Sequence, residues 1–295
     1  MFENFDEMRV DAGEATLFAR RAGRGAPLIL LHGFPQTGAA WHRVAPVLAE
    51  RFDVIVPDLR GYGRSDAPRD DAAHRRYAKR TMGRDIAGLM DALGIEAAHL
   101  LGHDRGARVA YRMALDLPQR VRRLGIVEIL PTAEYWRAMD AAFAMAAYHW
   151  VFLAQPYPMP ERLIAGDPRG YAKHTMASWT RDKDLSPFDP AALEEHLAQW
   201  DDPARVHAMC ADYRAGASAD RADDEADLEA GRRLAAPVRG IFADTGFPVR
   251  AGDPAAAWSR WAHEVETSVA RSGHFLPEEN PAALLDAMRP HFLAG

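Results

Sequence analysis

The chain places a carboxylate between two glycines where a strand-like run leads into a helical pattern. Residues 98–104 read AHLLGHD and residues 105–117 read RGARVAYRMALDL, so Asp104 stands at the turn between Gly102 and Gly106. The spacing is that of a G-x-S-x-G turn with Asp in place of Ser, in which the glycines remove clashes and the central side chain is presented above the sheet edge. An Asp before a helix can also be a simple N-cap. We favour a nucleophilic carboxylate over a cap.

Two arginines, Arg105 and Arg108, follow in the first turn of the expected helix. A helix N-terminus carries about +0.5 charge, so each cation there is unfavourable by roughly 0.3–1 kcal/mol. Spaced i and i+3, the two share a face near Asp104, and guanidinium groups bind planar anions through paired hydrogen bonds. The pattern predicts a carboxylate-binding site. Because Lys occurs only at 79, 173 and 183, the chain prefers Arg generally, and we interpret Arg112 as a surface arginine.

The elements that must position these residues alternate along the chain. Short apolar runs end in turn residues and are separated by helical patterns, as at 81–95 and 105–117. The apolar runs lie at 27–33, 53–59, 98–104, 123–130 and 237–244. Such alternation predicts an α/β fold with a mostly parallel sheet, helices on both faces and an active site at the carboxyl ends of the strands.

The alternation stops after residue 130 and resumes near 237, and the segment between is helical and rich in aromatic residues. We therefore predict a core domain of residues 1–132 and 226–295, with an inserted helical cap of residues 133–225. The highly charged segment 218–234 is expected to be a solvated connection back to the sheet.

The composition limits the kinds of molecule that the protein can be expected to bind. The 295 residues are 48% hydrophobic and carry a net charge of −6 with no basic block, which argues for a large core and against nucleic acid. The single cysteine, Cys210, cannot form an internal disulfide, and the first residues lack a signal-peptide pattern, so we expect a cytoplasmic protein. No window approaches the ~18 apolar residues of a membrane span. No clustered metal-ligand set is visible either, and we expect a small-molecule partner without a metal or organic cofactor.

Several longer motifs accompany the GHDRGARV turn. They are LLHGFPQTGAAWHRV, ILPTAEYW, YHWVFLAQP, ADYRAGA and SGHFLPEENP. Together they resemble the fluoroacetate dehalogenases of the α/β-hydrolase fold, from about residue 14 to residue 288. The HGFP and GHD elements are shared with epoxide hydrolases and haloalkane dehalogenases, whereas the arginine pair and the cap elements HW and DYRAG are more specific. The resemblance implies hydrolytic dehalogenation of a short 2-haloacid by a homodimer.

The resemblance also implies a catalytic series. Asp104 would be the nucleophile and His274, in a Gly-flanked loop, the base, in the chain order usual for this fold. The acid would be Glu128 in GIVEILPT, where the family usually has Asp. Asp244 in IFADTGFP is the alternative, although the usual acid position after that strand falls on Gly246.

Further roles follow from the same resemblance. The backbone amides of Phe34 and Arg105 would form the oxyanion hole, and Arg105 with Arg108 would bind the substrate carboxylate. By the same resemblance, His149, Trp150 and Tyr213 would donate hydrogen bonds to the leaving halide. Trp179 and Tyr135 would line the pocket.

The implied reaction passes through an aspartyl ester that a His-activated water then hydrolyses. Epoxide hydrolysis is the closest alternative, since it uses the same Asp, His and acid but needs cap tyrosines such as Tyr148, Tyr157 or Tyr213. A carboxylate-binding or receptor-like protein would keep the arginines but would not need Asp104 and His274 together.

Overall fold

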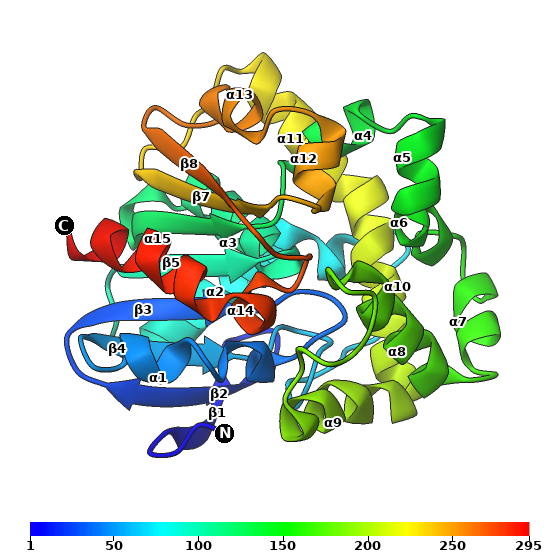
Figure 1. Cartoon of the computed structure of the whole chain (residues 1–295), viewed down its shortest axis with the longest axis horizontal. Helices are drawn as coiled ribbons and strands as arrows, with labels where there is room; N and C mark the ends of the chain where they lie inside the picture. The colour runs from blue at the N-terminus through cyan, green and yellow to red at the C-terminus, as the bar shows by residue number, and fades with distance from the viewer. Residues whose placement is uncertain (295) are drawn as a thin grey trace.

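In the computed structural model, which describes residues 1–294, eight strands form one sheet in the order β1-β2-β4-β3-β5-β6-β7-β8 (Figure 1). β2 pairs antiparallel with β1 and with β4, and every other neighbouring pair is parallel. The strands are β1 Asp6–Asp11, β2 Thr16–Gly23, β3 Ala26–Leu31, β4 Phe52–Pro57, β5 Ala98–His103, β6 Val121–Val127, β7 Val238–Ala243 and β8 Val265–Ala270. The predicted mostly parallel α/β architecture is confirmed.

Helices cover both faces of this sheet because its central strands are apolar on both sides. In β3, Ile29 and Leu31 belong to the core cluster that includes residues of α2 and α3, while Leu28 and Leu30 belong to the cluster that includes residues of α1 and α15. The core helices are α1 Ala45–Leu48, α2 Lys79–Ala92, α3 Arg105–Asp116, α12 Phe247–Ala251, α13 Pro254–Ser259, α14 Leu276–Glu279 and α15 Pro281–Leu293.

The chain between β6 and β7 is helical, and α5–α10 gather at one end of the sheet (Figure 1). Three of these helices begin at an Asp-Pro pair, where the side chains of Asp167, Asp189 and Asp202 accept backbone N–H groups of the first turn. The insertion consists of α4 Thr132–Arg137, α5 Ala141–Ala146, α6 Tyr148–Leu153, α7 Met159–Ile164, α8 Pro168–Trp179, α9 Pro190–Ala198, α10 Pro203–Ala217 and α11 Ala219–Glu229. None of the described helices is both long and apolar enough to cross a bilayer.

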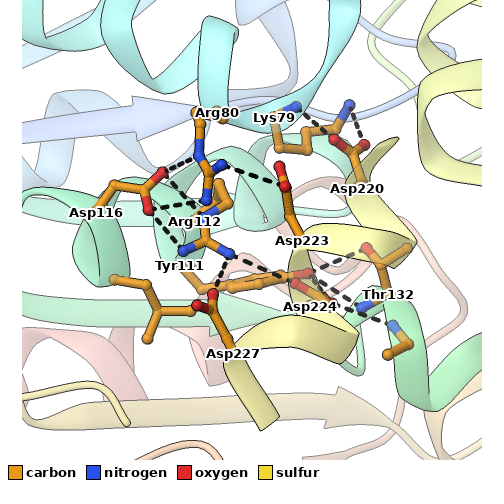
Figure 2. A network of polar contacts seen from close by, with 12 residues as sticks. Lys79, Arg80, Tyr111, Arg112, Asp116, Thr132, Asp220, Asp223, Asp224 and Asp227 are labelled. Atoms are coloured by element: carbon orange, nitrogen blue, oxygen red, sulfur yellow. Dashed lines mark hydrogen bonds and ion pairs between the residues drawn. The ribbon is translucent and has the colours of Figure 1, made fainter. Parts of the chain in front are cut away.

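The charged segment 218–234 differs from the expectation of a solvated connection. Much of it is helix α11, and Asp220, Asp224 and Asp227 on this helix are buried. They meet cations of the core helices, with Arg112 paired to Asp227 and Lys79 to Asp220 (Figure 2). The prediction was wrong because the number of charges in a segment does not show whether distant cations pair with them.

The interpretation of Arg112 as a surface arginine is also wrong, because the residue is 1% exposed and bridges Asp116 and Asp227. The predicted boundary between residues 225 and 226 falls inside α11. This helix contacts both α10 of the insertion and, through its acids, the core helices α2 and α3.

Candidate active site

Asp104 lies in a sharp turn between β5 and α3. Its backbone has φ +47° and ψ −118°, a conformation that non-glycine residues seldom adopt. The flanking glycines are required by close approach, because a Cβ on Gly102 would lie 2.4 Å from Cα of Ala107 and one on Gly106 would lie 2.3 Å from the carbonyl oxygen of Leu31. The Asp104 side chain makes no capping hydrogen bond to α3. The capping interpretation is therefore wrong, and the carboxylate is free for other partners.

The Asp104 carboxylate faces an amide on one side and an imidazole on the other. Oδ1 accepts the backbone N–H of Phe34 at 2.9 Å, and Oδ2 lies 3.9 Å from Nε2 of His274. Burial by itself would raise the pKa of Asp104, but the adjacent His274 ring and the guanidinium groups of Arg105 and Arg108 outweigh burial and hold this pKa below its usual value. Asp104 is thus kept ionised, as a nucleophile must be.

Glu128 lies directly behind His274. Its Oε2 is 3.4 Å from Nδ1 of His274, and its Oε1 accepts the backbone N–H of Ala243 at 2.6 Å. Glu128 follows β6 with φ +60° and is fully buried. Burial raises the pKa of Glu128, and His274 opposes that rise. The three side chains form the series Glu128, His274, Asp104.

Asp244, the alternative acid, lies outside this series. Its side chain is 38% exposed and pairs with Arg181 at 2.5 Å, and its Oδ1 also accepts the backbone N–H of Ser272 at 3.2 Å. The structure therefore brings Glu128 to His274 and directs Asp244 elsewhere.

The two arginines of α3 are buried and only partly hydrogen-bonded. Nε and Nη2 of Arg105 donate to Asp212, while Nη1 of Arg108 donates to the carbonyl of Leu130 and to the hydroxyl of Thr132, both at 3.0 Å. Within the described chain, Nη1 of Arg105 and Nε and Nη2 of Arg108 have no partner. Buried N–H groups of a cation are costly when unpaired, so these atoms indicate a site for an anion.

Aromatic side chains of the insertion hold both guanidinium groups. The Trp150 ring lies 5.6 Å from Cζ of Arg105 and 4.6 Å from Cζ of Arg108, so one ring contacts both. Tyr213 lies 4.4 Å from Cζ of Arg105, and Tyr135 lies 4.8 Å from Cζ of Arg108. The predicted site residues Trp150 and Tyr213 and the lining residue Tyr135 are thereby brought together over α3.

The imidazole ring of His149 also carries a buried nitrogen without a hydrogen-bond partner in the described part of the chain. Its Nδ1 is buried and has no partner among residues 1–294, and its ring lies 4.2 Å from that of Trp179 and 6.4 Å from that of Phe34. Burial holds the pKa of His149 well below its usual value, so the ring is neutral. Nε2 of His274 is likewise buried and unpaired.

The other predicted site residues are the backbone amide of Arg105 and the cap tyrosines, and only some of them lie at the site. Arg105 is the first residue of α3, where backbone N–H groups have no acceptor within the helix, as an oxyanion-hole amide requires. Tyr148 is partly buried, but Tyr157 is 63% exposed and packs against His207, away from the arginines.

Sequence reasoning missed Asp212, which holds Arg105 in place. Its carboxylate also accepts the hydroxyl of Tyr62 at 2.7 Å and pairs with Lys79. Burial opposes ionisation of Asp212, but Arg105 and Lys79 hold its pKa far below the usual value. One signal was available, because Lys79 is a rare lysine in an arginine-rich chain.

In the part of the chain that the structure describes, no three His, Cys, Asp or Glu side chains converge in a way suited to a metal ion. The arrangement is instead that of a nucleophile, a base with its acid, and an anion site formed by two guanidinium groups. It supports displacement by a carboxylate followed by hydrolysis of the resulting ester.

A mostly parallel sheet, a nucleophile turn after β5 and a late-loop histidine define the class of protein. The chain belongs to the α/β-hydrolase family, whose description as "alpha/beta hydrolase fold" matches residues 26–158.

Similar proteins carry two different activities in their names. A fluoroacetate dehalogenase from Burkholderia sp is 39% identical over 281 residues, which cover 95% of this chain and 91% of the relative. A soluble epoxide hydrolase from Corynebacterium sp. (strain C12) is 33% identical over 275 residues, covering 92% and 91%. A crystal structure from Nostoc sp PCC 7120, provisionally described as an α/β hydrolase, has 43% identity and a TM-score of 0.96 over 99% of both chains.

Proposed function

We propose that the protein is a haloacetate dehalogenase that converts fluoroacetate and water to glycolate and fluoride. The observation that carries the proposal is the set of unpaired, buried N–H groups on Arg105 and Arg108 next to Asp104. An anionic carboxylate would satisfy these groups, whereas a neutral substrate would leave them unpaired. The named activity of the Burkholderia relative agrees with this substrate.

In the first step, the two arginines hold the substrate carboxylate so that its CH₂ carbon faces Asp104. An Asp104 oxygen forms a bond to this carbon as the carbon–fluorine bond breaks, and fluoride leaves with the electron pair. His149, Trp150 and Tyr213 would donate hydrogen bonds to the departing fluoride. The product of this step is an ester on Asp104.

In the second step, Nε2 of His274 takes a proton from water, and the hydroxide formed attacks Cγ of Asp104. The negative charge that develops on Oδ1 is met by the Phe34 amide, which already donates to Oδ1 at 2.9 Å, and by the amide of Arg105. Glu128 stabilises the imidazolium ion. His274 then returns the proton to the glycolate oxygen as the ester bond breaks. This leaves Asp104 as a carboxylic acid, which loses its proton to solvent and so regenerates the carboxylate.

Epoxide hydrolysis is the second candidate, favoured by the similarity to the Corynebacterium enzyme. Of Tyr148, Tyr157 and Tyr213, only Tyr213 is buried next to Arg105. Tyr213 would therefore have to protonate the epoxide oxygen. A receptor-like role is less favoured, because binding alone does not need the series of Glu128, His274 and Asp104.

The reaction is tested by incubating the purified protein with fluoroacetate, chloroacetate, styrene oxide and 1-chlorobutane. We expect fluoride and chloride from the two haloacids, detected with ion-selective electrodes, and little product from the neutral compounds. Diol from the epoxide without halide from the haloacids would overturn the proposal.

The covalent intermediate gives a second test. We expect Asp104→Asn to lower turnover at least about 10³-fold, because the nucleophile is lost. His274→Asn should still form the ester but not hydrolyse it, so mass spectrometry should find a carboxymethyl group on Asp104 after fluoroacetate treatment. A His274→Asn protein that turns over normally, or that never gains this mass, would contradict the ester mechanism.

A further inference from the structure

A cavity, here called the outer cavity, lies next to the series of Glu128, His274 and Asp104. It has a volume of about 290 Å³ and is lined from α5, α8 and α12 and from the loops that carry Lys183 and His274. Its lining includes three aromatic rings, those of Trp179, Phe247 and His274. Their centroids lie 5.4–5.7 Å apart, so each ring contacts the other two.

His274 links the outer cavity to the Asp104 carboxylate. Its ring lines the outer cavity, while its Nε2 lies 3.9 Å from Oδ2 of Asp104. Asp104 itself is only 7% exposed. The His274 ring therefore stands between a small solute in the outer cavity and the Asp104 carboxylate.

The outer part of the cavity carries positive charge. Lys183 and Arg250 line it and are exposed, and no Asp or Glu is among the lining residues. Within residues 1–294, neither side chain forms an ion pair with a carboxylate; Nζ of Lys183 donates to the carbonyl of Ser178 at 2.8 Å. Partial burial and the nearby Arg250 lower the pKa of Lys183, so the two like charges sense one another.

Neighbouring carboxylates have other partners. Glu279 accepts the backbone N–H groups of Arg181, Gly273 and Phe275, and Asp244 pairs with the Arg181 side chain. Glu279 partly offsets the charge of Lys183, but neither Lys183 nor Arg250 forms an ion pair with it, so net positive charge remains at the cavity.

We propose that the outer cavity is the entrance to the active site and an outer binding site for short carboxylates, held by Lys183 and Arg250. The carboxylate would bind there first and then pass Trp179 and Phe247 to reach Arg105 and Arg108. This inference rests on the proposed function, because it takes the substrate to be an anion. Clustered charge of one sign at a cleft raises the local concentration of the opposite ion and the association rate, and salt weakens the effect.

The first test is the kinetics of a double variant, Lys183→Ala/Arg250→Ala. At low ionic strength we expect kcat/KM for chloroacetate to fall about 3–10-fold, with kcat changed less than about twofold. The difference should disappear in about 1 M salt, where the Debye length is about 3 Å.

The matched control is Arg24→Ala/Arg122→Ala, which removes two exposed cations that form no ion pair within residues 1–294 and do not line the outer cavity. We expect its kcat/KM for chloroacetate to remain within about twofold of the parent value. An equal fall in both double variants, or a fall that does not depend on salt, would overturn the inference.

The second test does not require turnover. Iodide and acrylamide quench tryptophan fluorescence on collision, and the contribution of Trp179 is found by subtracting the signal of Trp179→Phe. We expect Lys183→Ala/Arg250→Ala to reduce iodide quenching of Trp179 at least about twofold at low salt and to leave acrylamide quenching unchanged. Unchanged iodide quenching would overturn the outer site, whereas absence of halide release by the parent protein would overturn only the proposed function.

Discussion

At the scale of single residues, the Glu128 carboxylate occupies space that a glycine leaves open. A Cβ on Gly246 would lie 2.2 Å from Oε2 of Glu128 and 2.4 Å from Oε1. Gly246 itself has φ −74° and ψ 168°, which alanine adopts without strain. This glycine is therefore needed for the room it leaves beside Glu128 rather than for its backbone freedom.

Gly246→Ala should displace Glu128 from His274 and lower kcat for chloroacetate roughly 10–100-fold, because the imidazolium ion loses its acid partner. The shorter side chain of Glu128→Asp would leave room for the added methyl group. The double variant Glu128→Asp/Gly246→Ala should therefore be more active than Gly246→Ala alone. Steady-state kinetics of the parent, both single variants and the double variant test this, and full activity of Gly246→Ala would contradict it.

The choice of acid is tested by a matched pair of amides. Glu128→Gln should lower kcat roughly 10²-fold or more, since the buried partner of His274 loses its charge, whereas Asp244→Asn should change it less than about threefold. Both replacements remove one negative charge from a strand end. The reverse ranking in kcat would assign the acid to Asp244.

At the scale of elements, α10 places two neighbouring residues on the arginine site. Tyr213 packs on the guanidinium of Arg105, and Asp212 binds the same guanidinium while also reaching Lys79 at the start of α2 and Tyr62. Both Asp212 and Arg105 are fully buried. Helix α10 therefore holds the Arg105 guanidinium of α3, the group proposed to bind substrate, through a buried charge network.

Asp212→Asn should leave Arg105 and Lys79 short of a negative partner. We expect KM for chloroacetate to rise about tenfold or more and the free energy of unfolding to fall by about 3–5 kcal/mol. Tyr62→Phe removes a single hydrogen bond to Asp212 and should cost about 1 kcal/mol with a small change in KM. Kinetics and urea unfolding measure both effects; an unchanged KM in Asp212→Asn would show that Arg105 does not depend on Asp212.

Helix α11 carries a carboxyl group with an unusual pKa. Asp224 accepts the hydroxyl of Tyr111 at 2.8 Å and the backbone N–H of Ala133 at 3.1 Å (Figure 2). Burial raises its pKa from 3.8 to about 7, even though these hydrogen bonds and Arg112 oppose the rise. The folded protein therefore keeps this proton over a pH range in which the unfolded chain has released it.

The higher pKa of Asp224 in the folded protein makes the free energy of unfolding depend on pH. As the pH rises from about 4 to about 7, the contribution of Asp224 to stability is lost, because only the folded state still binds the proton. Relative to Asp224→Asn, the parent protein should lose about 4 kcal/mol of unfolding free energy across this range, at about 1.4 kcal/mol for each unit of pKa difference. The free energies of unfolding are measured with urea at several pH values. Asp223→Asn, on the same helix, is the control: the difference in unfolding free energy between this variant and the parent should not decline between pH 4 and pH 7.

At the scale of the whole molecule, the sheet and the helical insertion share one hydrophobic core. Ile29 and Leu31 of β3 belong to the same buried cluster as Trp150 of α6 and Met209 of α10. A polar link joins the two parts as well, because Glu278 of α14 contacts His196 of α9 at 3.2 Å. On the face of the sheet covered by α2 and α3, the buried apolar surface of the sheet is continuous with that of the insertion.

We therefore expect the insertion and the sheet to unfold together. Scanning calorimetry should show one transition with a calorimetric enthalpy close to the van't Hoff enthalpy, since a shared core couples the two parts. Two separate transitions, with α5–α10 lost first, would contradict a single cooperative unit.

The sequence by itself determined the alternation of strands and helices, the turn at Asp104 and the residue types around it. These features are local: an apolar run of a given period and a glycine on each side of Asp104 act within a few residues of the chain. The tertiary structure decided which acid serves His274, which N–H groups of Arg105 and Arg108 stay unpaired, and that the acids of α11 are buried. Glu128 and His274 are 146 residues apart, and such distant contacts depend on how the elements pack rather than on any pattern within one of them.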